Sequence, residues 1–312
     1  MFSVSYRTRN VQDRTGTMSS TQIRWTPFGR YVGATTALTY ALIVLGGAVR
    51  TTGAGDACPD WPLCHGRFIP PLEPLVLLEY AHRLVAATVG LLILGAVVWI
   101  HRLPAVRGGR PWAWSALGLV VVQGILGGVT VLSGLATWSV VLHLGTSLLV
   151  LASLLVLAVR ALDPESRPAS SAYRALVASS LVALYGLVLL GGYVGASGAG
   201  LACPDWPLCR GALFPRLEPG VFPHVAHRAA AVVVLVLLGF LVVRTRQERP
   251  DLAGLAHAAA VALGLEIAVG AANKLLRLHP AVVTVHLGLA ALVWALLVVL
   301  FMLVSTPSAR RV

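Results

Sequence analysis

The chain carries little charge for its length. Only 12% of its 312 residues are charged and 57% are hydrophobic, whereas a soluble domain has about 25% charged and roughly 45–50% apolar residues. This composition excludes an ordinary soluble globular protein. Apolar stretches of about 20 residues, the length that a helix needs to cross a bilayer, make up most of the sequence. The chain is therefore predicted to be a polytopic helical membrane protein.

The chain also lacks a basic cluster, although its formal net charge is +12. Its 24 lysines and arginines are nearly all arginines, and they are scattered over short connections between apolar runs. This distribution excludes a nucleic-acid partner and indicates membrane topology instead. Residues 91–100 are apolar at every position, which excludes the alternating pattern of an outer-membrane barrel.

The hydropathy pattern predicts an all-α integral membrane protein with eight transmembrane helices. We expect them near residues 31–50, 77–101, 112–132, 139–160, 174–195, 223–243, 254–274 and 281–304. No small-residue cleavage site follows the first apolar run, so it is interpreted as a span and not as a removable signal. Most arginines lie in the first 30 residues, in the second, fourth and sixth connections, and in the tail. The positive-inside rule then predicts a multi-pass protein of the cell inner membrane with both termini cytoplasmic.

An internal repeat divides the chain into two halves. The heptapeptide CPDWPLC at residues 58–64 recurs unchanged at 203–209, and the same spacing of 145 residues carries Ala81-His82-Arg83 onto Ala226-His227-Arg228. Four spans per half predict two parallel-repeat four-helix bundles. We place the N-terminal half at 31–160 and the C-terminal half at 174–304. A basic cytoplasmic tail at 1–30, a cytoplasmic linker at 161–173 and a cytoplasmic tail at 305–312 complete the chain.

Each repeated heptapeptide contains two cysteines in a loop that this topology places on the oxidising, extracytoplasmic side. The natural pairing is one local bridge per loop, Cys58 with Cys64 and Cys203 with Cys209, although four cysteines allow three connectivities. Three roles remain open for these cysteines. They are a structural staple, a redox-active pair and a shared zinc site.

Four of the nine histidines lie inside apolar runs, on the second and fourth helix of each half: His82, His143, His227 and His286. Ionisable side chains at membrane depth are expensive and indicate function, although a single one can simply bond between helices. All four lie within about two turns of the outer end of their helices. Each half can therefore present two imidazoles at one depth, which favours bis-histidine haem ligation over a bare metal ion.

Other residues of the helices fit this interpretation. Gly124, Gly127 and Gly128 in one half, and Gly186, Gly191 and Gly192 in the other, would let helix backbones retreat from a macrocycle, although small residues also pack membrane helices without haem. Arg83 and Arg228 follow the first histidine of each half. Their guanidinium groups would bind haem propionates, or would extend to lipid headgroups.

The two halves differ at two positions that carry chemistry. Glu79 aligns with His224, so the N-terminal half has a carboxyl group one helical turn before His82. Such an acid could relay protons. Glu266 aligns with Gln123 and is either a second acid of the site or an interhelical hydrogen-bond partner. This asymmetry predicts one site for chemistry and one for electron storage.

In combination these motifs resemble the haem A synthase family, which makes the haem of terminal cytochrome oxidases. The resemblance covers residues 31–304 and rests on these segments: 53–64 (GAGDACPDWPLC), 79–83 (EYAHR), 141–145 (VLHLG), 202–209 (ACPDWPLC), 227–228 (HR) and 285–288 (VHLG).

The resemblance implies oxidation of a ring methyl of haem O to a formyl group through successive hydroxylations. It implies haem b on His227 and His286, and the substrate haem O near His82 and His143. Glu79 matches a carboxylate beside the substrate site, and Cys58 and Cys64 match a disulfide next to it. The apolar substrate would enter from the lipid, so we expect the N-terminal site to open toward the bilayer.

The sequence leaves the partners of this enzyme open. The electron donor is either a quinol or a small redox protein, haem O synthase is a candidate partner, and a homo-oligomer is compatible with the chain. An alternative from another class is a di-haem b electron carrier, linked to quinol, without chemistry on either haem. A third is a membrane thiol oxidoreductase that uses the two cysteine pairs.

Overall fold

The computed structural model describes residues 26–103, 106, 108–162, 167 and 169–305. Within them the chain forms eight long helices and no named strand. The helices are α1 (Pro27–Thr51), α2 (Pro74–Ile100), α3 (Arg110–Leu132), α4 (Thr137–Ala161), α5 (Ser171–Ala196), α6 (Val221–Glu248), α7 (Ala253–Leu275) and α8 (Pro280–Ser305). All eight are long and apolar enough to cross a membrane, which confirms the predicted all-helical membrane protein. Residues 1–25 and 306–312 of the predicted tails, and residues 163–166 and 168 of the predicted linker, lie outside the described residues.

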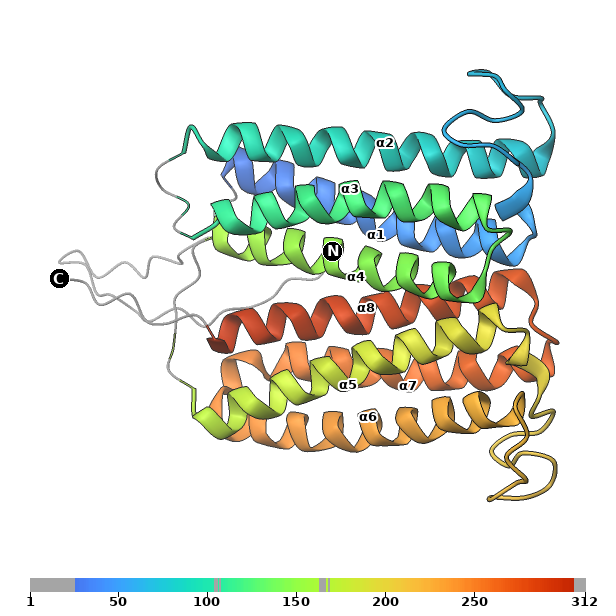
Figure 1. The fold of residues 1–312 in the computed structure, drawn as a ribbon. Helices are drawn as coiled ribbons and strands as arrows, with labels where there is room; N and C mark the ends of the chain where they lie inside the picture. Colours follow the sequence, from blue (N-terminus) through green and yellow to red (C-terminus); the bar gives the residue numbers. More distant parts are fainter. Residues whose placement is uncertain (1–25, 104–105, 107, 163–166, 168, 306–312) are drawn as a thin grey trace, which may run out of the picture.

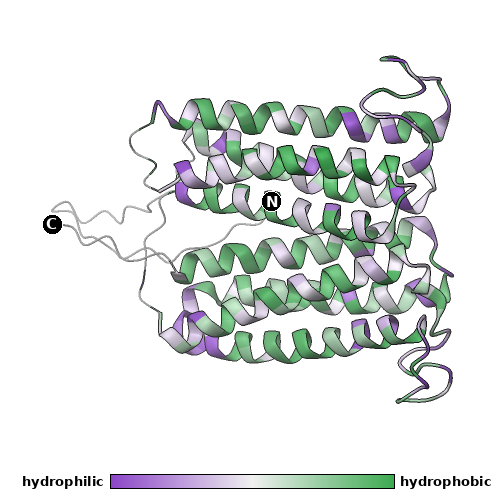
Figure 2. Cartoon of the chain, in the orientation of Figure 1, coloured by the Kyte–Doolittle hydropathy of each residue, from purple (hydrophilic) through white to green (hydrophobic). Residues whose placement is uncertain are grey.

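Helix boundaries follow from local signals in the sequence. Proline occupies the first turn of α1, α2 and α3, where its missing N–H is not needed and its φ suits a helix. Thr26 and Ser170 cap α1 and α5 by accepting the N–H groups of Gly29 and Tyr173 at 2.9 and 3.1 Å. The helix middles are apolar and the polar residues gather toward the helix ends (Figure 2).

Each half of the chain forms its own set of neighbouring helices. In the first half α1 packs against α2, α2 against α3, α3 against α4, and α4 against α1, and α5 to α8 repeat this pattern. Contacts of α1 and α4 with α8, and of α4 with α5, join the two sets (Figure 1). Each helix therefore packs against two other helices of its own half.

Contacts between the halves occur in matched pairs. Leu287 of α8 lies against Gly47 of α1, and at the repeated positions Leu144 of α4 lies against Gly192 of α5. Figure 1 shows α4 and α8 in the centre of the molecule, where the indole of Trp294 donates to the carbonyl of Leu148 at 2.9 Å. The two leucine–glycine contacts join equivalent positions of opposite halves.

The loop between α1 and α2 and the loop between α5 and α6 lie at the same end of the molecule (Figure 1). Each begins with a short 3-10 helix, η1 (Ala54–Asp56) or η2 (Ala199–Leu201). A third, η3 (Pro250–Leu252), precedes α7 at the opposite end. The N-terminal ends of α2, α4, α6 and α8 therefore share the end with the two cysteine-bearing loops. We call it the loop end.

Candidate functional site

The four cysteines form two local disulfides. Cys58 is bonded to Cys64 and Cys203 to Cys209, as the sequence predicted. The part of the chain that the structure describes contains no free cysteine and no cluster of three or more histidine, cysteine or acidic side chains that could hold a metal ion. Because all four thiols are used in disulfides, they cannot supply thiolates to a shared zinc site.

An aspartate organises each disulfide loop. Asp60 accepts the N–H groups of His65 and Gly66 at 2.6 and 2.8 Å, and Asp205 accepts those of Arg210 and Gly211 at 2.6 and 2.7 Å. Gly66 and Gly211 have φ of 68° and 76°, a left-handed conformation that glycine adopts at little cost. The N–H donors, Gly66 and Gly211 foremost, hold the pKa of each aspartate below its ordinary value because they stabilise the carboxylate.

Arg83 and Arg228 bind the loops to the helices. Arg83 Nη1 donates to the carbonyls of Asp60 and Leu63 at 2.8 and 2.5 Å, and Nη2 donates to Cys58 O at 3.1 Å. Arg228 donates in the same way to carbonyls of residues 205, 207 and 208 at 2.8, 3.2 and 2.5 Å. From the sequence, these guanidinium groups were expected to bind haem propionates or to extend to lipid headgroups. Their contacts with the loops were not predicted. Propionate binding stays a prediction for both.

Glu79 takes part in the same contacts between the disulfide loop and α2. Its side chain is buried, Oε2 accepts the Cys58 N–H at 2.7 Å, and Oε1 lies 2.5 Å from Arg83 Nη2. One turn of α2 separates it from His82. The carboxylate therefore links the disulfide to the helix that carries the first histidine. At the matched position, the buried His224 instead places Nδ1 3.0 Å from the carbonyl of Ala199.

The four predicted histidines lie at equivalent depths below the loop end. His143, His227 and His286 follow the first residues of α4, α6 and α8 by six positions, and His82 follows that of α2 by eight. These separations correspond to about 9 and 12 Å along the helix axes. Within each half, the two histidines are near enough for a charge on one to act on the other. The structure thus brings His82 together with His143, and His227 together with His286.

Each histidine packs against a glycine of the preceding helix. A Cβ at the glycine would lie 2.8–3.3 Å from the imidazole Cε1. The pairs are Gly46 with His82, Gly127 with His143, Gly191 with His227, and Gly270 with His286. Gly127 and Gly191 are among the glycines that were expected to leave space for a haem. The roles of Gly46 and Gly270 were not predicted. Comparison of the repeats could have found Gly270, because it occupies the position that matches Gly127.

The orientation of the imidazoles fits axial ligation. All four Nδ1 atoms are buried without a hydrogen bond, and the residues are half-buried as a whole. None of their Nε2 atoms makes a hydrogen bond within the described ranges. An imidazole whose Cε1 packs on a glycine and whose Nε2 makes no hydrogen bond keeps the nitrogen that haem iron takes. The donor set therefore fits a haem in each half.

The two sites differ in the residue one turn before the glycine. In the C-terminal half, Glu266 Oε1 lies 3.0 Å from His286 Nδ1, in a direction that does not make a hydrogen bond. In the N-terminal half, Gln123 occupies this position and its Oε1 is buried without a partner. Glu266 thus belongs to the environment of His286, as the first of the two roles expected from the sequence requires.

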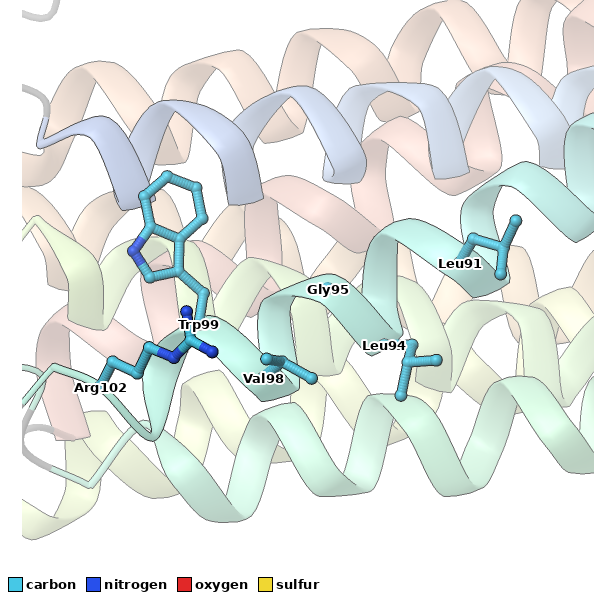
Figure 3. A pocket seen from close by; sticks show the side chains of 6 residues that line it. All are labelled: Leu91, Leu94, Gly95, Val98, Trp99 and Arg102. Atoms are coloured by element: carbon cyan, nitrogen blue, oxygen red, sulfur yellow. The ribbon is translucent and has the colours of Figure 1, made fainter.

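A surface hollow on α2 is separate from this site. It has a volume of about 540 Å³ and is lined by Leu91, Leu94, Gly95, Val98, Trp99 and Arg102, which belong to α2 and the turn after it (Figure 3). Leu91 and Val98 are 70% and 50% exposed. The hollow lies toward the end opposite the loops and contains none of the four histidines, so it is a lipid-facing feature of α2.

Comparison with known proteins agrees with this geometry. The family described as cytochrome oxidase assembly protein matches residues 29–298. A protein named haem A synthase from Symbiobacterium thermophilum is 34% identical over 278 residues, which cover 85% of this chain and 91% of the relative. Another of that name from Shouchella clausii is 32% identical over 294 residues, covering 89% of this chain and 98% of the relative. The chain therefore belongs to the cytochrome oxidase assembly protein family.

Proposed function

We propose that this protein is a haem A synthase, an oxidoreductase that converts a ring methyl of haem O to the formyl group of haem A. The observation that carries the proposal is the fourfold glycine–histidine contact, which supports two imidazoles in each half at one depth. Family membership, and relatives named haem A synthase over most of their length, favour this function over a di-haem electron carrier.

We assign a different haem to each half of the protein. His227 and His286 would hold haem b as a permanent prosthetic group, and His82 and His143 would receive haem O. The difference at Glu79 supports this order, because only the N-terminal half has a buried carboxylate one turn from its first histidine. When bound, haem supplies the redox chemistry that an unactivated methyl group requires.

The protein's own residues orient and enclose the substrate. The imidazoles of His82 and His143 would set the depth of the ring, and Arg83 binds the disulfide loop to α2 at the loop end. Trp61 of this loop packs on α3, because a Cβ at Gly128 would lie 2.9 Å from its ring. Glu79, held by Arg83 and the Cys58 N–H, is placed to accept and pass on a proton beside the substrate half.

The arginine distribution supports a definite orientation in the cell inner membrane. We place both termini and the linker in the cytoplasm and the disulfide loops outside. Haem O would enter the N-terminal half laterally from lipid, with its propionates toward the loop end near Arg83. A quinol or a small redox protein would supply electrons, haem O synthase would deliver the substrate, and a homo-oligomer is compatible with the apolar outer faces of α2, α3 and α6.

Pigment extraction tests the proposed reaction. Membranes that contain this protein and a source of haem O, supplied with oxygen and electrons, should yield a haem with the red-shifted pyridine haemochrome of a formyl porphyrin. The His143→Ala variant in the same membranes is the control and should yield none. Recovery of haem O and haem b alone from the wild-type membranes would refute the synthase and favour the electron carrier.

A further inference from the structure

The only lysine of the chain lies at the loop end of the C-terminal half. Lys274 belongs to the last turn of α7 and follows Gly270, the glycine that supports His286, by one helical turn on the same face. It is half-buried, and its Nζ donates to the carbonyl of Gly200 in η2. The ammonium group therefore extends from α7 across to the entrance of the loop between α5 and α6, above the level of the histidines.

No carboxylate neutralises this ammonium group. None of the ion pairs in the described part of the chain involves Lys274. The charged and titratable groups that act on it are Arg228 and His224 of α6 and Asp205 of the loop. Asp205 already accepts two backbone N–H groups. The entrance thus combines an ammonium and a guanidinium group with one nearby carboxylate, that of Asp205, which forms an ion pair with neither.

The N-terminal half has the same construction without this charge. Leu135 contacts Gly55 of η1 as Leu278 contacts Gly200 of η2, so the corresponding helix turns pack on the corresponding 3-10 helices. Val131 occupies the position that matches Lys274. Arg83, which matches Arg228, is paired with the buried carboxylate of Glu79. The cation of the N-terminal entrance is therefore paired with a buried carboxylate, whereas the C-terminal entrance has two cations and neither forms an ion pair with a carboxylate.

We infer that Lys274, together with Arg228, binds a propionate carboxylate of the haem held by His227 and His286, and so makes the C-terminal site the retaining one. The inference rests on the proposed function. A haem that lies between the histidines with its propionates toward the loop end brings its carboxylates to the level of Lys274, one turn beyond His286. A half-buried cation without a counter-ion gains more from such a partner than an exposed or already paired one. Val131 offers no such bond, which suits a site whose haem must leave.

Haem transfer from the purified full-length protein to excess apomyoglobin tests this role. We expect Lys274→Met to release haem b at least about tenfold faster than wild type, the effect of losing one charge-assisted hydrogen bond. Lys274→Arg should stay within about threefold of wild type. Arg277→Gln, which removes an exposed charge three residues away, is the matched control and should not change the rate. In the other half, Val131→Lys should slow the release of added haem O.

The possible results distinguish a failure of this inference from a failure of the proposed function. If Lys274→Met and Arg277→Gln both release haem b at the wild-type rate, the lysine has no role in retention and the inference is wrong. If Lys274→Met and Lys274→Arg both release haem b faster than wild type and lose thermal stability equally, Lys274 only holds α7 against η2. The inference is then wrong as well. A wild-type protein without haem b would refute the proposed function itself.

Discussion

The imidazole of His227 lies so close to Gly191 that a Cβ at this position would be 2.8 Å from Cε1. Real Cβ atoms do not approach a neighbour this closely, so the ring occupies space that only glycine leaves free. The same relationship between a histidine and a glycine of the preceding helix occurs four times. The glycines thus determine where the imidazoles stand, and this gives the first prediction.

Gly191→Ala should displace the His227 imidazole and lower the haem b content of the purified protein severalfold. Alanine is about 1 kcal/mol better than glycine in a helix, so the helix itself is not weakened. Gly195→Ala on the same helix is the control, since a Cβ there meets nothing within 4 Å. The ratio of haem b absorbance to protein measures the effect, and equal haem content in the two variants would contradict the role of Gly191.

Arg83→Gln should destabilise the N-terminal half by about 3–5 kcal/mol, because it leaves the buried carboxylate of Glu79 without its partner. The double variant with Glu79→Gln should be less destabilised than Arg83→Gln alone, since no buried charge is then unpaired. Denaturation of the three variants in detergent checks this order. Additive losses in the double variant would mean that the two side chains are not coupled.

Glu79→Gln should abolish haem A formation while leaving the haem b absorbance intact. The substitution keeps the size of the side chain but removes the group that would accept and pass on protons in the substrate half. Haem b content and product are measured on the same membranes. Normal product formation would exclude Glu79 from the chemistry, and a loss of haem b would contradict the assignment of the two halves.

The Cys58–Cys64 loop should loosen in acid because of Asp60. The pKa of this aspartate is lowered in the folded loop, since the N–H groups of Gly66 and His65 stabilise the carboxylate. Its contribution is therefore complete above the ordinary carboxyl pKa of about 4 and is lost as the pH falls through the lowered folded value. The rate at which a phosphine reduces Cys58–Cys64, relative to the Asp60→Asn variant, should rise below about pH 4. An unchanged ratio between pH 7 and pH 3 would contradict this role.

Cys58→Ala should weaken haem A formation without abolishing it, because the Cys58 N–H that Glu79 accepts is a backbone group and persists. Arg83 also continues to hold the loop through the carbonyls of Asp60 and Leu63. Product yield from membranes is compared with that of His143→Ala. Complete loss in Cys58→Ala, with activity retained in His143→Ala, would favour the thiol oxidoreductase.

Much of the fold could be predicted from the sequence because each span is a continuous apolar run ended by proline, glycine or arginine. The expected spans agree with the helices to within a few residues, apart from α6, which continues to Glu248. The polar end of α6 is the reason, since hydropathy alone does not extend a span through Arg244 and Arg246. The local disulfide pairing was also predictable, because only a few residues separate the partners.

The contacts of single side chains could not be predicted in the same way. Arg83 and Arg228 bind loop carbonyls, and no pattern in the sequence reveals how a loop folds back on its helix. Lys274 and Gly270 are different, because the repeat alone pairs them with Val131 and Gly127. Comparison of the last turns of α3 and α7 would have found both. Their spatial neighbours, Gly200 and His286, come only from the structure.

The absorption spectra of purified His143→Ala and His286→Ala test the division between the halves most directly. We expect His286→Ala to lack the haem b bands, and His143→Ala to retain them while forming no haem A. Equal haem b content in the two variants would contradict the assignment of a permanent haem to the C-terminal half and a substrate haem to the N-terminal half.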